Sequence, residues 1–468
     1  MDPYEYPRPA DSYRYRPSGR RALLAENERR TPAAEVIAGL RIKDPREVTL
    51  AFVHHREQKS YTCQLVFTDR PDDSWTAYCV RESQITAPLR DLRTAWDEAI
   101  RAQGWETRLD LKGPDEARWA PVFEQLEKAG QAAFEAIFLN HEDVVPMNEL
   151  TAELCARLRA KPCVIGIWSD DLFAPWGLLC LPPPTEDEAG LTGGPEGSAD
   201  AAALTDCEVC DAAEYADGRT LAEIWGPRFL GYRHLIEHRG RQRHADCAGP
   251  LIELRGRARP GTLSLVLTDP PRGHGTVADL LTRHTDQLDC ASRTNRFLAA
   301  LHADRFDRQI IYVCCHGQGY SQDPARLYAS TVVTESITVG DVLSAVAGGN
   351  RSRARRHGCG VTHLHGGPLL YMSVCRAGDY TPASGEPVSR TLAELGTSCL
   401  VAPEVITPKV LAVEHAKRFF GPFLDGVEAG RQLRAITQDL AREYGTLLGL
   451  IYAVKGRQDA RLQQAVAS

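Results

Sequence analysis

The chain has 468 residues, a hydrophobic fraction of 43% and a formal net charge of −7 at pH 7. This length predicts one large elaborated domain or two smaller ones, because a single hydrophobic core stops growing at about 250–300 residues. The negative charge gives no sign of direct nucleic-acid binding, and no apolar run reaches the roughly 18 residues of a membrane span. With no signal-peptide pattern at its start, the chain is expected to be cytoplasmic and its 14 Cys to be reduced thiols.

The first 160 residues divide into a tail and a subdomain. Residues 1–30 contain seven Arg, four Tyr and four Pro without apolar periodicity, which predicts a disordered tail or a docking segment for a partner. Residues 31–160 predict an α+β subdomain, a β-meander followed by amphipathic helices, and nothing in it indicates catalysis. The meander strands are expected at 48–53, 61–67 and 75–80, and the helices carry apolar stripes formed by Leu89, Leu92, Trp96 and Ile100, by Val122, Leu126, Ala133 and Ile137, and by Leu150, Leu154 and Leu158.

Strands and helices alternate from residue 161 to 468, which predicts an α/β domain with a mostly parallel sheet flanked by helices. An acidic loop is expected at 183–219, where residues 185–218 hold ten Asp or Glu and no Lys or Arg, and it could also be a site of regulatory cleavage. Strands are expected at 163–168, 263–268, 309–315, 368–374 and 398–402, and helices at 277–288, around 297–301, from about 408 and around 433–444.

Two polar clusters in this domain have alternative interpretations. Cys207, Cys210, His244 and Cys247 are suitable ligands for a structural zinc, but their order and the long intervening segment favour unrelated loop thiols, so no metal is expected. The basic run at 351–357 is typical of a solvated loop, and it could equally be an autoprocessing or docking site.

Two apolar runs each end in a residue that can take part in nucleophilic chemistry. Residues 309–315 lead to His316, and residues 368–374 lead to Cys375. Catalytic groups in open parallel sheets collect at the carboxyl ends of the strands, so adjacent strands would put imidazole beside thiol. The imidazole would help to form the reactive thiolate, and backbone N–H groups of Gly317 and Cys375 could form an oxyanion hole. The alternative is that Cys375 is an ordinary buried thiol and His316 a loop histidine.

Cys314 and Cys315 are the rival nucleophiles, because they directly precede His316. Side chains alternate along a strand, so we expect these two thiols on opposite faces of the sheet and at least one of them in the core.

The residues around the Cys-His pair resemble the catalytic signatures of CHAT-domain proteins, a family of caspase-like and separase-like cysteine peptidases. His-Gly-Gln at 316–318 is similar to the His-Gly signature, and Met-Ser-Val-Cys at 372–375 to the Ser-x-Cys signature. Segments 173–179, 263–270 and 449–456 resemble the family in the same order, so the similarity extends over residues 45–460. The resemblance implies a caspase-like fold with His316 as general base, Cys375 as nucleophile and no cofactor.

The resemblance also implies an endopeptidase that cleaves one specific protein in bacterial antiphage immunity or regulated cell death, for example a gasdermin-like pore-former. No helical repeat of about 34 residues is evident, so the activating sensor is expected in another chain or in the N-terminal region. A catalytically silent caspase-like scaffold that binds a peptide or a partner protein is the alternative. A different thiol enzyme, such as an acyl transferase, is a third.

Charges near the nucleophile predict the substrate preference. Asp379 follows Cys375 on a Gly-containing loop, and Glu404 follows the strand expected at 398–402. Arg376 is the one nearby base, and its side chain is expected to point away from the cleft. Two carboxylates at one edge of the sheet favour Arg or Lys at the cleavage position, with Asp379 and Glu404 binding the substrate. The alternative is that Asp379 caps a turn and the pocket is apolar.

Overall fold

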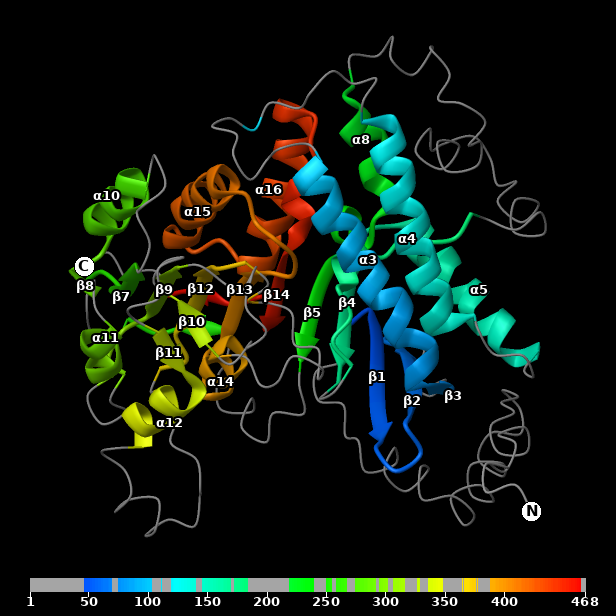
Figure 1. Ribbon diagram of the computed structural model, residues 1–468, viewed down its shortest axis with the longest axis horizontal. Helices are drawn as coiled ribbons and strands as arrows, with labels where there is room; N and C mark the ends of the chain where they lie inside the picture. Colours follow the sequence, from blue (N-terminus) through cyan, green and yellow to red (C-terminus); the bar gives the residue numbers. More distant parts are fainter. Residues whose placement is uncertain are drawn as a thin grey trace.

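An 11-stranded sheet, in the order β3-β2-β1-β4-β5-β14-β13-β12-β9-β7-β8, runs through the computed structural model (Figure 1). The structure describes residues 46–69, 75–102, 111, 119–139, 145–169, 172–183, 219–239, 250–254, 258–266, 274–291, 294–301, 306–315, 326–328, 336–347, 364, 366–375, 377 and 388–463. The strands of the sheet are β1 (Val48–His55), β2 (Ser60–Phe67), β3 (Trp75–Arg81), β4 (Val164–Trp168), β5 (Leu235–Arg239), β7 (Gly261–Val266), β8 (Gln287–Ala291), β9 (Ile310–Cys314), β12 (Leu369–Ser373), β13 (Cys399–Pro403) and β14 (Tyr452–Gly456).

Two blocks of parallel strands make up this sheet. In the first block, β1, β4, β5 and β14 run in one direction, and in the second block β13, β12, β9, β7 and β8 run in the other. The blocks meet at the antiparallel pair β13–β14, and β2 and β3 extend the first block as an antiparallel meander. The expected α/β fold with a mostly parallel sheet is confirmed. Because the blocks run in opposite directions, β9, β12 and β13 end at the edge where β5 and β14 begin.

Helices flank the second block on both faces. In Figure 1, α10, α15 and α16 lie on one side of β9, β12 and β13, and α11, α12 and α14 lie on the other. The α-helices of the described residues are α3 (Glu82–Ala102), α4 (Ala120–Phe138), α5 (Val145–Ala160), α8 (Leu221–Trp225), α9 (Leu230–Arg233), α10 (His274–His284), α11 (Thr294–Ala300), α12 (Val339–Ala347), α14 (Val388–Glu394), α15 (Lys409–Leu424) and α16 (Ala429–Tyr444). None of them combines the length and the apolar character that a bilayer crossing requires.

Successive residues of β9 pack into two separate apolar cores. Ile310, Tyr312 and Cys314 belong to the core that also contains the buried faces of α15 and α16, whereas Ile311 and Val313 belong to the core on the opposite face. All five are at most 6% exposed. Burial on both faces explains why this strand is a continuous apolar run and not an alternating one.

One element differs from its expected type. The apolar spacing at 277–288 predicts a single helix, but α10 ends at His284 and Leu288 lies in β8. The N–H of Asp286 donates to the carbonyl of Pro260, and from Gln287 the chain pairs in parallel with β7. Pairing with β7 therefore ends the helix one turn earlier than expected. The spacing of apolar residues does not show this end, because it continues to Leu288.

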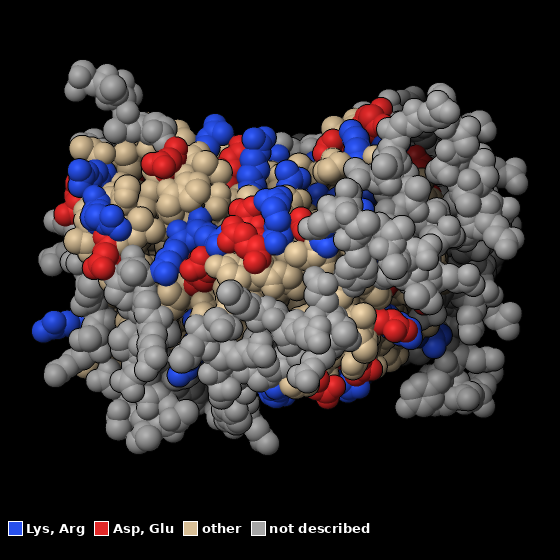
Figure 2. Space-filling model, turned by 90° about the horizontal axis from the view of Figure 1, so that it is seen from above, with Lys and Arg blue, Asp and Glu red and all other residues tan. Residues whose placement is uncertain are grey.

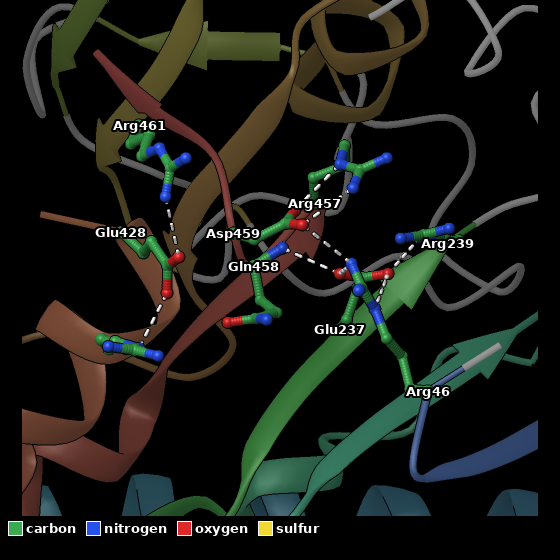
Figure 3. A network of polar contacts seen from close by, with 9 residues as sticks. Arg46, Glu237, Arg239, Glu428, Arg457, Gln458, Asp459 and Arg461 are labelled. Atoms are coloured by element: carbon green, nitrogen blue, oxygen red, sulfur yellow. Dashed lines mark hydrogen bonds and ion pairs between the residues drawn. The ribbon is translucent and has the colours of Figure 1, made fainter. Parts of the chain in front are cut away.

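The sequence pattern does not predict β5, because Glu237, His238 and Arg239 follow one another in it. Glu237 is 0% exposed, and its carboxylate accepts hydrogen bonds from Arg46 Nη2 (2.9 Å) and from the backbone N–H of Gln458 (3.1 Å), while Arg239 pairs with the same carboxylate (Figure 3). Arg239 belongs to β5 itself, whereas Arg46 precedes β1 and Gln458 follows β14, so distant segments help to offset the burial of the charge.

The predicted domain division stays a prediction. Within the described residues, β1 pairs with β4 in parallel across the boundary between 31–160 and 161–468, so the meander continues the main sheet. The tail at 1–30 lies outside the described residues, as do residues 184–218 of the acidic loop and the basic run at 351–357.

Candidate active site

The two strands that lead to the predicted Cys-His pair are neighbours in the sheet. β9 and β12 pair in parallel, and the register runs from Leu369 with Ile310 to Ser373 with Cys314. The expectation that both strands end at the same edge is therefore confirmed. In the sequence Cys375 and His316 each stand two residues beyond the last pair, and of the two the structure describes Cys375.

Cys375 lies on a short turn that is fixed at both sides. Val374 before it is 1% exposed, and the N–H of Ala377 donates to the carbonyl of Val374 (3.1 Å). The Ser389 hydroxyl, in the first turn of α14, donates to the carbonyl of Ala377 (2.5 Å). The turn is therefore held between the end of β12 and the start of α14.

The thiol of Cys375 contacts the backbone of Thr407. The Thr407 N–H donates to Sγ at 3.4 Å, and Sγ lies 3.8 Å from the Thr407 carbonyl oxygen. The neutral S–H can donate to this carbonyl, and the thiolate can accept from this N–H. Because a hydrogen bond donated to the charged form favours that form, the contact with the N–H promotes ionisation of the thiol.

Helix α15 begins beside this thiol. Its N-cap is Pro408, the residue after Thr407, and the helix has 16 residues. The amino end of a helix carries a partial positive charge, which lowers the pKa of a nearby thiol. The proline signal in the sequence predicts the start of this helix, but no local signal connects that start with Cys375.

Cys375 differs from the other described cysteines in its exposure. The structure describes the burial of eight cysteines, of which seven are buried and Cys375 is half-exposed. Cys314 and Cys315 belong to opposite apolar cores, as the strand alternation predicts, and both are buried. Burial raises the pKa of the Cys315 thiol well above its usual value, and the nearby Cys314 and Cys375 raise it further. Burial therefore makes Cys314 and Cys315 less accessible to a substrate than Cys375.

A buried polar cluster lies beneath the nucleophile and was not predicted from the sequence. The Tyr371 hydroxyl is 2.7 Å from His415 Nδ1, and the His415 ring stacks on Tyr452 with centroids 3.8 Å apart. His415 is 0% exposed, and burial lowers the pKa of its imidazole to about 3. A neutral, enclosed imidazole of this kind supports the core and is not a candidate general base.

Glu404 lies at the end of β13, at the edge where Cys375 lies, as its sequence position predicts. Its side chain is 1% exposed, and its carboxylate accepts a hydrogen bond of 2.5 Å from Lys455 Nζ of β14. Glu404 and Lys455 also line a cavity of about 40 Å³ together with His238 and Tyr452. Lys455 therefore neutralises the Glu404 carboxylate, and the role of Glu404 in substrate binding stays a prediction.

Several predicted site residues lie outside the described residues: His316, Gly317, Asp379, Cys207, Cys210, His244 and Cys247. Among the residues that are described, no group of three or more His, Cys, Asp or Glu side chains is arranged to hold a metal ion. The described part of the candidate site is therefore a thiol, the backbone of Thr407 and the amino end of α15.

Comparison with known proteins gives similarity at the level of structure. No protein-family model and no curated protein matches the chain. Two solved structures of the separase–securin complex of Saccharomyces cerevisiae align with it, both at 8% identity. The first has a TM-score of 0.45 and covers 92% of this chain and 31% of the separase chain, and the second has a TM-score of 0.40 and covers 87% and 30%. The chain thus spans about a third of the length of the separase chains that it matches.

Proposed function

We propose that the chain is a cysteine endopeptidase of the caspase-like CHAT type, with Cys375 as its nucleophile. The observation that carries the proposal is the half-exposed thiol of Cys375 at the carboxyl end of β12, with the Thr407 N–H directed at its sulfur. A thiolate is the reactive form of cysteine, and both this N–H and the start of α15 favour it.

His316 is the proposed general base. It follows β9, and β9 is the immediate parallel neighbour of the strand that carries Cys375. In the proposed reaction the thiolate attacks the scissile carbonyl, and His316 gives the thiol proton to the leaving amine. Water then hydrolyses the thioester, which restores the thiol. The backbone N–H groups of Gly317 and Cys375 are the proposed oxyanion hole, and the chemistry needs no metal or organic cofactor.

The biological setting that we propose comes from the resemblance to CHAT-domain proteins. The substrate is a specific protein, such as a gasdermin-like pore-former, in bacterial antiphage immunity or regulated cell death. The activating sensor is a separate chain, and the enzyme acts in the cytoplasm. Asp379 and Glu404 are the proposed substrate-binding residues, and because Lys455 already pairs with Glu404, selection by charge depends mainly on Asp379.

Alkylation of the full chain tests the nucleophile without requiring its activator. We expect iodoacetamide to label Cys375 faster than any of the seven buried cysteines of the described residues, as read by mass spectrometry of the peptides. Cys315→Ala, which removes the buried thiol on the neighbouring strand, serves as the matched control and should keep the labelling at Cys375. Faster labelling at another described cysteine would contradict the assignment.

Cleavage of a peptide library tests the reaction itself. Cys375→Ala and His316→Ala should each abolish cleavage, and the double variant should lose little more than either single one, because paired groups act as a unit. Cys315→Ala should retain activity. A reactive Cys375 with no cleavage of any peptide, in the presence of the activating partner, would favour an acyl transferase, and an unreactive Cys375 would favour a scaffold.

A further inference from the structure

Helix α3 carries a buried carboxylate that contacts the loop beside the nucleophile. Asp97 is 1% exposed, and its Oδ1 accepts a hydrogen bond of 2.9 Å from the backbone N–H of Ile406. We propose that Asp97 is a positioning residue for Cys375, which holds segment 404–407 in the conformation that directs the Thr407 N–H at the thiol. This inference rests on the proposed role of Cys375 as the nucleophile.

Asp97 lies on the buried face of α3, among residues of the apolar core. Leu92, Trp96 and Ile100 of the same helix are at most 2% exposed and pack in the larger apolar core. Asp is rarely fully buried unless it is paired or hydrogen-bonded, because removing a carboxylate from water is strongly unfavourable. The hydrogen bond to Ile406 is therefore part of what offsets the burial of this side chain.

Three backbone N–H groups fix the course of segment 404–407. The N–H of Glu404 donates to the carbonyl of Ile451 (2.8 Å), the N–H of Ile406 donates to Asp97, and the N–H of Thr407 donates to Sγ of Cys375. Each contact goes to a different part of the fold. Because the N–H groups of Ile406 and Thr407 belong to successive peptide planes, the orientation of the first limits that of the second.

Arg93 links the same helix to α14 through Phe173. It stands four residues before Asp97, so both side chains lie on one face of α3. Its Nη2 donates to the carbonyl of Phe173 (2.5 Å), and the Phe173 ring lies 5.0 Å from the guanidinium of Arg390 in α14. Helix α14 in turn holds the nucleophile turn through Ser389. Helix α3 thus contacts segment 404–407 directly through Asp97, and it is linked to α14 through Phe173.

Asp97 is expected to affect ionisation of the Cys375 thiol in two opposing ways. Two variants separate these effects. Its hydrogen bond to Ile406 supports the N–H that favours the thiolate, whereas its negative charge disfavours the thiolate. Asp97→Asn removes the charge and keeps an acceptor oxygen at the same position. Asp97→Ala removes both the charge and the acceptor. Neither variant carries the charge, so the difference between them includes the hydrogen bond and excludes the charge.

The experiment measures the rate of alkylation of Cys375 by iodoacetamide against pH in the full chain. We expect the midpoint of Asp97→Asn to lie at or below that of the unmodified protein. The midpoint of Asp97→Ala should lie about one pH unit above that of Asp97→Asn, as the partial loss of a hydrogen bond to a charged group implies. Leu92→Ala, which removes a 0% exposed apolar side chain from the same helix, lowers stability and should leave the midpoint unchanged.

Equal midpoints for Asp97→Asn and Asp97→Ala would overturn the inference, and so would a shift of the same size in Leu92→Ala. If Asp97→Ala does not fold, Asp97→Ser is the substitute, because the serine side chain is too short to accept the N–H of Ile406 in the same way. The midpoint of Asp97→Ser is then expected above that of Asp97→Asn. A Cys375 that is not alkylated faster than the buried cysteines contradicts the proposed function instead, so the two failures are distinguishable.

Discussion

At the scale of single residues, cysteines with the same thiol group have different surroundings. Cys375 and Cys315 stand near the ends of neighbouring parallel strands, but Cys315 faces an apolar core and Cys375 faces the start of a helix. Burial raises the pKa of the Cys315 thiol, and it also raises the pKa of the Cys163 thiol to about 12. Exposure and a directed N–H therefore distinguish the proposed nucleophile from the thiols that serve as small apolar residues.

Substrate preference is a prediction at the same scale. With Asp379 four residues after the proposed nucleophile in the sequence, we expect fluorogenic peptides that end in Arg or Lys to be cleaved faster than those that end in Asp or Leu, because a charged side chain needs an opposite charge in its pocket. Asp379→Asn should reduce this preference. Glu404→Gln should reduce stability more than preference, since it removes the buried partner of Lys455. Faster cleavage of the Asp or Leu peptides would show that the pocket is not acidic.

At the scale of elements, the site depends on how closely the segment before β14 packs on α16. The short 3-10 helix at Leu448–Ile451 provides the carbonyl of Ile451 that holds Glu404. Gly449 in this helix faces α16 so closely that an added Cβ would be 2.5 Å from Thr437 Cα and 2.9 Å from its Oγ1. Glycine is therefore required at 449 because of the close approach of two backbones.

Two glycine substitutions test this packing. Gly449→Ala should lower the free energy of unfolding by about 1–3 kcal/mol, because the backbone of Thr437 must shift to make room. Gly421→Ala on α15 is the control, because an added Cβ there would have nothing within 4 Å. It should be neutral or stabilise by up to about 1 kcal/mol through helix propensity. Urea denaturation measures both, and equal effects of the two changes would contradict the packing argument.

At the scale of the whole molecule, we expect buried contacts to contribute more to stability than exposed ion pairs. Among the described residues on the face seen in Figure 2, basic and acidic side chains are interspersed. Ion pairs such as Arg418 with Glu414 and Glu443 are partly exposed, and exposed pairs contribute little. The charge network around Glu237 differs from these pairs, because the Glu237 carboxylate is buried. This network connects the residues just before β1, strand β5 and the segment after β14 (Figure 3).

Three buried histidines make the stability of the whole molecule depend on pH. Burial lowers the pKa of His234 and His415 to about 3, and lowers the pKa of His238 well below its ordinary value. The unfolded chain takes up protons at these side chains near pH 6.5, whereas the folded chain does not. The stability that they provide is therefore fully present above pH 6.5, and it is lost as the pH falls from there toward 3.

We expect the free energy of unfolding to fall between pH 6.5 and 5 by up to about 1.4 kcal/mol per pH unit for each of these histidines. Urea denaturation at several pH values measures this slope. His234→Asn should reduce this slope by the share of one histidine, up to about 1.4 kcal/mol per pH unit, and the amide oxygen can still accept the N–H of Cys163 that His234 Nδ1 accepts (3.2 Å). A constant free energy of unfolding over this interval would show that these imidazoles are not neutral in the folded chain.

The sequence by itself determined the elements that local patterns specify. The continuous apolar runs at 309–315 and 368–374 predict β9 and β12, since strands buried on both faces have this composition, and Pro408 predicts the start of α15. The positions of His316 and Cys375 directly after two such runs were sufficient to predict a site at the end of adjacent strands. The described residues confirm the strands and their pairing, and the role of His316 stays a prediction.

Only the tertiary structure decided the surroundings of the thiol and the membership of β5 in the sheet. Thr407 is 32 residues from Cys375, Lys455 is 51 residues from Glu404, and Asp97 is 309 residues from Ile406. Nothing in the local sequence of either partner indicates these contacts, because each depends on where the sheet brings two distant segments together. Glu237 is a further example. Burying its carboxylate in a central strand is unfavourable, and Arg46, Arg239 and the backbone N–H of Gln458 offset that cost only in the folded chain.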